Sequence, residues 1–222
     1  MSLAESLLSQ LRRLQLAHLV ERPSVVPWLA VYSFVNGCIS IGLMAAAALV
    51  TGEAFVFPSL GPTAFLFFYT PLAPAASPRN ALLGHAIGAG AGWLSLALFG
   101  LRDEGPATAE GVTAARVLAA GLSLGLTSGL MVLVRAPHPP AGATTLIVSL
   151  GILREPKQLV VLMLAVALLT AQAFVMNRTA GILYPAWSPG PDGTSSAPAR
   201  PQPAGAATPA GREAIDGTDA PR

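Results

Sequence analysis

Charged residues are scarce in this 222-residue sequence: Lys and Arg number 13 and Asp and Glu 11, together 11 %. An ordinary soluble domain has about 25 %. Hydrophobic residues make up 53 %, and the mean hydropathy is +0.59. Such a chain lacks the charged exterior that water requires, which argues against a soluble enzyme and predicts an all-α integral membrane protein in a lipid bilayer. The net charge of +2 is too small for a nucleic-acid footprint, so no nucleic-acid partner is expected.

Cysteine and catalytic clusters are also lacking. The single cysteine, Cys38, lies in an apolar run and cannot form an intramolecular disulfide. No Cys or His cluster has metal-ligand spacing, and no carboxylate stands beside His85 or His138 in the sequence. These absences argue against an intramembrane enzyme, and we expect no metal and no cofactor.

Long uncharged stretches organise the rest of the chain. A membrane-spanning helix needs about 20 apolar residues. Four stretches predict plain spanning helices, with approximate ranges 28–50, 81–99, 115–134 and 159–176.

Two further uncharged stretches, residues 54–78 and 136–153, are interrupted by prolines. Proline favours the first turn of a helix and prevents its extension toward the N-terminus. We therefore expect a short helix at about 63–68, or a little longer, and a second at 141–150. Ten helical residues cover about 15 Å, half the hydrocarbon thickness, so these segments predict broken or re-entrant helices.

The two ends of the chain have a different composition. Residues 1–22 begin with a capping-box pattern and continue with leucines at helical spacing, which predicts an amphipathic helix on the membrane surface. Residues 185–222 are rich in Pro, Gly, Ala and Ser, which predicts a disordered tail.

The broken segments resemble each other and indicate an internal repeat, with halves at about 27–101 and 112–178. Residues 58–66 (PSLGPTAFL) align with residues 139–147 (PPAGATTLI), matching Pro, Gly and Thr. Duplicated halves with broken helices are typical of transporters. If the broken segments span the bilayer, each half crosses three times and the halves are inverted; if they are re-entrant, each crosses twice and the halves are parallel. Both arrangements place both termini in the cytoplasm.

Three sequence blocks resemble the HPP family of integral membrane proteins, which is named for a His-Pro-Pro motif. They are residues 59–64 (SLGPTA), 77–88 (SPRNALLGHAIG) and 136–145 (APHPPAGATT), in the family's order. The resemblance covers roughly residues 27–178, within a predicted transmembrane domain at 23–180. It implies a compact helical bundle with about four spanning helices. Some relatives are associated with nitrite transport, so the resemblance implies a small anion as cargo.

The repeated Gly-x-Thr turns are the first candidate site. The first turn of a helix has free N–H groups and a partial positive charge, and it binds anions without a cationic side chain. Two half-helices meeting near the bilayer midplane would form such a site. The alternative is a simple helix start with a capping hydroxyl. The residues are Gly61, Thr63, Gly142, Thr144 and Thr145.

Two histidines and a polar pair complete the candidates. His138 is held extended by the following prolines and is predicted to cap a helix, gate an entry or carry a proton with an anion; the alternative is a rigid turn. His85 lies in an uncharged helix, where an ionisable residue faces the bundle interior, either for function or to bond a neighbouring carbonyl. Arg79 and Asn80 open that helix and form either an anion funnel or an ordinary interfacial anchor.

Glycines recur every fourth residue in two of the predicted spanning helices: Gly84, Gly88 and Gly92, and Gly121, Gly125 and Gly129. Such faces let helix backbones approach closely. We expect both helices to be central in the bundle.

The leading functional hypothesis is a membrane transporter or channel for a small inorganic anion, plausibly nitrite. The alternative is a non-transporting sensor or scaffold module that acts through the surface helix and tail. We expect a multi-pass protein of a bacterial inner membrane. A bundle with few crossings often needs partners to enclose a polar path, which favours a homo-oligomer.

Overall fold

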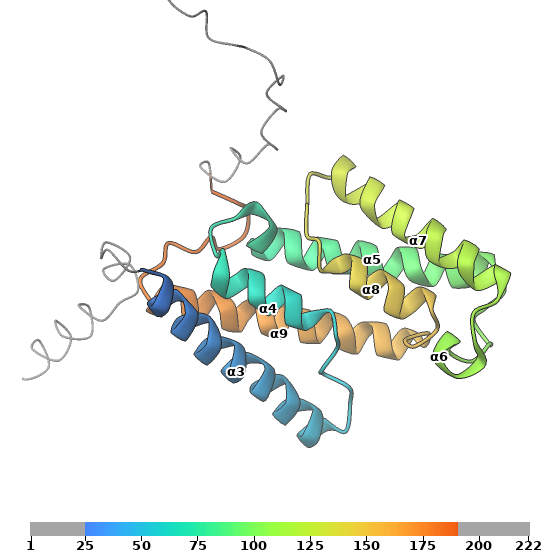
Figure 1. Cartoon of the computed structure of the whole chain (residues 1–222), viewed down its shortest axis with the longest axis horizontal. Helices are drawn as coiled ribbons and strands as arrows, with labels where there is room; N and C mark the ends of the chain where they lie inside the picture. Colours follow the sequence, from blue (N-terminus) through green and yellow to red (C-terminus); the bar gives the residue numbers. More distant parts are fainter. Residues whose placement is uncertain (1–24, 191–222) are drawn as a thin grey trace, which may run out of the picture.

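The computed structural model describes residues 25–190, which form helices and connecting segments with no strand (Figure 1). The predicted surface helix, 1–22, and residues 191–222 of the predicted tail lie outside this range. Within it, four helices are long and apolar enough to cross a membrane: α3 (Val25–Thr51), α5 (Pro78–Leu98), α7 (Ala114–Leu133) and α9 (Pro156–Thr179). The shorter elements are α4 (Leu60–Tyr69), the 3-10 helix η1 (Pro74–Ala76), α6 (Ala107–Glu110) and α8 (Ala141–Ser149).

The long helices begin where the sequence offers caps. Ser77 accepts a hydrogen bond from the Asn80 N–H ahead of the first-turn proline of α5. Glu155 and Gln158 form a capping box around the first-turn proline of α9. Each cap satisfies N–H groups that a helix start leaves unpaired. The four predicted spanning helices are confirmed, and each predicted boundary lies within three residues of the observed one.

The two short helices, α4 and α8, confirm the predicted breaks. Their ten and nine residues correspond to about 15 Å, against about 31 Å for the 21 residues of α5. Non-helical segments, residues 52–59 and 134–140, precede them. Each half-helix therefore starts inside the bundle and ends at one of its faces (Figure 1).

One face of the bundle, here called the terminal face, holds the start of α3 and the end of α9. Tyr32 in α3 donates a hydrogen bond to Asn177 near the end of α9, at 2.9 Å. The start of α5 and the end of α7 also lie here, because the Arg79 guanidinium donates to the carbonyls of Val134 and Arg135. Consequently α3 and α5 run away from the terminal face, and α7 and α9 run toward it.

The half-helices end at opposite faces. Asn177 donates to the carbonyl of Phe67 in the last turn of α4, at 3.0 Å, which places that end at the terminal face. Arg116, in the first turn of α7, donates to the carbonyl of Ser149 at the end of α8, so α8 ends at the opposite face. The helices α3, α4 and α5 thus run in directions opposite to those of α7, α8 and α9, respectively. These directions are those of the inverted arrangement that the sequence left open beside the parallel one.

Helix α5 is central and packs against α7, α8 and α9. Its glycine face allows the contact with α8: a Cβ added at Gly88 would lie 2.7 Å from the Ala141 carbonyl oxygen, and one at Gly92 would lie 2.8 Å from the Val148 Cβ. The glycines of α7 behave differently, because a Cβ added at Gly121, Gly125 or Gly129 would meet nothing within 4 Å. The glycine face therefore mediates close helix packing in α5, as expected, but not in α7, whose glycines face outward.

Candidate functional site

Four of the predicted site residues meet in one buried cluster, here called the His–Thr cluster. Its members are Thr63, His85, His138 and Thr144, and none of them is exposed. The Thr63 hydroxyl lies 2.9 Å from His85 Nε2 and 3.2 Å from His138 Nε2. The two Nε2 atoms are 3.2 Å apart, and His85 Nδ1 lies 2.7 Å from the Thr144 hydroxyl. Residues far apart in the sequence thus form one continuous set of polar contacts.

Four different segments supply these side chains. Thr63 is the fourth residue of α4, and Thr144 is the fourth residue of α8. His85 is the eighth residue of α5, about 10 Å along that helix from the terminal face. His138 comes from the segment before α8, where the following proline restricts its backbone. The cluster therefore joins the starts of the two half-helices through an imidazole of the central helix.

The direction of the hydrogen bonds follows from one fixed acceptor. His138 Nδ1 lies 2.7 Å from the Ala75 carbonyl oxygen, which can only accept, so this nitrogen carries a proton. In the neutral ring Nε2 is then an acceptor, and His85 Nε2 faces it at 3.2 Å as the donor. The one proton of the Thr63 hydroxyl goes to the Ser59 carbonyl at 2.9 Å, so the Thr63 oxygen accepts from His85 Nε2–H. His85 Nδ1 then accepts from the Thr144 hydroxyl, and the two histidines have opposite tautomers.

Three other predicted site residues lie outside the cluster. Gly61 is exposed at the start of α4. Gly142 is half-buried, and its nearest neighbour across the packing is a methyl of Leu124, 3.5 Å from an added Cβ. Thr145 is buried, but its hydroxyl pairs with that of Thr127 at 2.8 Å and donates to the Ala141 carbonyl. The Gly-x-Thr motif therefore brings only its Thr63 and Thr144 hydroxyls to the histidines.

The first-turn N–H groups of α8 already donate hydrogen bonds within the protein. The N–H groups of Ala141, Gly142 and Ala143 donate to carbonyls three residues earlier, at 3.0–3.1 Å. In α4, Pro62 has no N–H to offer. The half-helix starts thus present fewer free backbone donors than the sequence suggested, and the hydroxyl and imidazole groups are the polar atoms that converge.

Arg79 and Asn80 act as anchors at the terminal face. The Arg79 guanidinium donates to the Asn80 side-chain oxygen and to the carbonyls of Val134 and Arg135, each at 3.0 Å. It thereby satisfies carbonyls that the end of α7 leaves free. Asn80 is buried, and its amide donates to the Pro74 carbonyl at 2.9 Å. Asn80 thus fixes the turn that carries the Ala75 carbonyl, and Arg79 fixes the segment that leads to His138, so both support the cluster without entering it.

Sequence reasoning missed Ser59, which occupies the N-cap position of α4 but whose side chain makes no capping hydrogen bond. Its carbonyl accepts a hydrogen bond from the Thr63 hydroxyl at 2.9 Å. Its own hydroxyl is buried and has no hydrogen-bond partner. A buried, unsatisfied hydroxyl is costly in a protein interior. The only sequence signal was its place before the Gly61-Pro-Thr63 turn, where helix-capping residues are common.

Charge is absent from the cluster and unevenly distributed between the two faces. Among residues 25–190, every Asp and Glu follows the end of α3, lies between α5 and α7, or precedes α9; they are Glu53, Asp103, Glu104, Glu110 and Glu155. All of these positions are at the face opposite the terminal one. The terminal face carries Arg79, Arg135 and Arg178 without a described Asp or Glu, whereas at the opposite face the carboxylates lie among Arg102, Arg116, Arg154 and Lys157. An anion approaching from the terminal face therefore meets positive charge and no described carboxylate.

A cavity of about 470 Å³ lies between the end of α7 and the segment that follows it, and His138 is one of its lining residues. Arg135 lines it as well and takes a φ of 52°, a conformation in which glycine is the usual residue after a helix. Met131, Val132 and Pro139 contribute apolar lining. Of the four cluster members, only His138 is among its lining residues.

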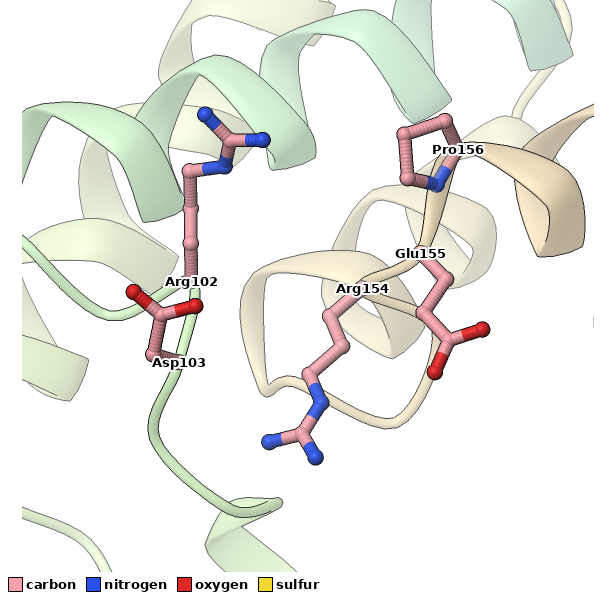
Figure 2. Close-up of a pocket in the computed structure, with 5 residues that line it drawn as sticks. All are labelled: Arg102, Asp103, Arg154, Glu155 and Pro156. Carbon is pink, nitrogen blue, oxygen red and sulfur yellow. The ribbon is translucent and has the colours of Figure 1, made fainter.

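A second cavity of about 300 Å³ lies at the opposite face, between the segments after α5 and before α9. Figure 2 shows that the Arg102 and Arg154 guanidinium groups point away from each other, and that Asp103 and Glu155 lie beside them. Arg102 stacks on the Trp93 ring, 4.4 Å from its centroid, and Arg154 donates to the Glu104 carbonyl. The cations do not converge on one point, so we do not assign a binding site here.

The family model for the HPP transmembrane region matches residues 22–185. This range contains all described helices, both half-helices and the four members of the His–Thr cluster. No curated protein and no solved structure matches the chain. The sequence match and the multi-pass helical fold agree, and the chain belongs to the HPP family of transmembrane proteins.

Proposed function

We propose that this protein moves a small inorganic anion across the membrane, with nitrite as the first candidate, and that the His–Thr cluster is the site the anion passes. The observation that carries the proposal is the meeting of both half-helix starts at one buried, polar and uncharged point. Polar and ionisable groups inside a membrane domain are costly and mark ion or substrate pathways. Broken helices at matching places in two halves of a membrane protein also indicate a substrate-binding site.

The inverted arrangement supports a duplicated origin of the two halves. Thr63 and Thr144 have the same rank in their half-helices, and they contact the two nitrogens of one imidazole, His85. The packing also corresponds: α4 packs on α3 and α9 as α8 packs on α7 and α5. In this proposal the pathway runs along the interface between the repeats, as in other inverted-repeat transporters.

The anion would be held by hydroxyl and imidazole N–H donors. Ser59 supports this, because its buried hydroxyl has a free donor one turn from Thr63. The cluster is fully buried, so passage requires the surrounding segments to open. The cavity beside His138 provides the entry from the terminal face, where Arg135 attracts anions.

Membrane orientation and assembly follow as part of the proposal. Cytoplasmic loops carry an excess of Lys and Arg. Arg12, Arg13 and Arg22 precede α3 in the sequence, and with Arg79, Arg135 and Arg178 they give six basic residues on the side of the terminal face. The opposite side has four: Arg102, Arg116, Arg154 and Lys157. We therefore place the terminal face, and both termini, in the cytoplasm. The outward glycine face of α7, with an apolar groove of about 440 Å³ along it, suits close packing of a second copy.

The test is nitrite flux into liposomes that contain only the purified protein. Flux several times faster than into empty liposomes supports the proposal, and removal of the Thr63 hydroxyl should remove most of the difference. Flux equal to that of empty liposomes, with protein shown to be folded and inserted, would reject it.

A further inference from the structure

The His–Thr cluster contains no fixed charge, and this has a consequence for its cargo. An isolated anion buried in a low-dielectric interior is very unfavourable unless an opposite charge accompanies it. The groups that surround the two histidines supply none. Thr63 and Phe67 come from α4, Thr144 from α8, and the Ala75 carbonyl from the turn before α5.

The ionisable groups nearest to the cluster do not compensate an anion either. Arg135 lines the cavity beside His138 but is exposed at its mouth. Arg79 is engaged with the carbonyls at the end of α7. The Tyr184 phenol donates to the Ala76 carbonyl at 2.5 Å. The described carboxylates all lie at the opposite face.

We propose that the His85–His138 pair takes up one proton with each anion and releases it with that anion, which makes transport electroneutral. This inference rests on the proposed function and specifies its coupling ion. The step balances without a further reactant: one proton from the surrounding solution adds to His138 Nε2 as the anion enters, and one proton leaves His138 Nε2 for the solution on the other side as the anion departs. The protein returns to its neutral state after each cycle.

Thr63 has the geometry that this uptake needs. Its hydroxyl donates to the Ser59 carbonyl at 2.9 Å, so both lone pairs of its oxygen are available to accept. In the neutral state His85 Nε2–H, 2.9 Å away, is the donor to this oxygen. When His138 Nε2 is protonated it becomes a second donor, and the same oxygen lies 3.2 Å from it. Thr63 thus offers the added N–H an acceptor without a rearrangement of the cluster.

The pair accepts only one proton at a time. Its two Nε2 atoms are 3.2 Å apart, and two imidazolium ions at that distance would repel each other strongly in a low-dielectric interior. The stoichiometry is therefore one proton to one anion.

The experiment uses the full chain in liposomes with an internal pH dye, at alkaline pH, where leakage of free nitrous acid is small. We expect one proton to enter with each nitrite, and we expect flux to be unchanged when a potassium gradient with valinomycin sets the membrane potential. Flux that carries current, or that moves no proton, overturns the inference and leaves the proposed function standing. A flux no faster than that into empty liposomes would count against both the proton coupling and the proposed function.

A variant and a spectroscopic readout separate proton coupling from a structural role. In H138Q, whose side chain does not titrate, flux should lose its pH dependence; in the unmodified chain, flux should rise by up to about tenfold per pH unit as the pH falls through the alkaline range. Nitrogen-15 NMR of labelled histidine in nanodiscs should show the Nδ1–H tautomer for His138 and the Nε2–H tautomer for His85. A pH profile unchanged in H138Q, or the reverse tautomers, contradicts the proposal whether or not the variant is fully stable.

Discussion

Replacing Thr63 by valine tests the His–Thr cluster most sharply, because the two side chains have nearly the same shape. The hydroxyl has three polar neighbours, at 2.9 Å, 2.9 Å and 3.2 Å. In T63V, His85 Nε2–H and His138 Nε2 can still face each other at 3.2 Å, so the loss is smaller than three full hydrogen bonds. A lost buried partner costs about 1–3 kcal/mol. If this cost falls on the anion-bound state, flux drops by about 5- to 150-fold, since about 1.4 kcal/mol corresponds to tenfold.

The assay pairs nitrite flux in liposomes with thermal unfolding in detergent. Thr170 provides a matched control: it is also buried, and its hydroxyl donates to the carbonyl four residues earlier, at 2.7 Å. T170V should lose about as much stability as a single buried hydrogen bond, about 1 kcal/mol, and should keep its flux. T63S restores the hydroxyl and should recover most of the flux. A folded T63V protein that transports at the rate of the unmodified chain would refute the role given to the cluster.

Three further predictions concern packing, anchoring and the tail. G88A should destabilise the bundle by about 1–3 kcal/mol, because the added Cβ would lie 2.7 Å from a carbonyl oxygen of α8. G125A adds its Cβ in open space and should leave the stability of the monomer unchanged. The unfolding temperatures of the two variants test this difference. R79M frees two carbonyls at the end of α7 and should cost about 1.5–3 kcal/mol, and an unchanged unfolding temperature would show that these bonds contribute nothing. Deleting residues 191–222 should leave nitrite flux intact, and loss of flux with the membrane domain folded would favour a sensor or scaffold.

Most of the fold was predictable because its causes are local in the sequence. Uncharged runs of about 20 residues identified the four long helices, and the prolines located α4 and α8 to within a few residues. The inverted arrangement was not decided, since basic residues near the membrane are distributed alike in both topologies. It follows from tertiary contacts such as the hydrogen bond between Tyr32 and Asn177, which are 145 positions apart.

The site was predictable as a set of residue types but not as a geometry. Thr63, His85, His138 and Thr144 were all candidates, yet no local pattern shows that two histidines 53 positions apart share a contact. Free helix amides were expected to dominate, whereas in α8 the first-turn N–H groups close onto their own turn. The outward glycines of α7 show the same limit: a repeat of small residues predicts a packing face but does not identify its partner.

Nitrite flux through the purified, reconstituted chain, measured in parallel with T63V and T170V, is the most direct test of the central claim. The account predicts fast flux for the unmodified protein and for T170V, and near-background flux for T63V. Equal flux for all three folded proteins, or none above that of empty liposomes, would contradict it.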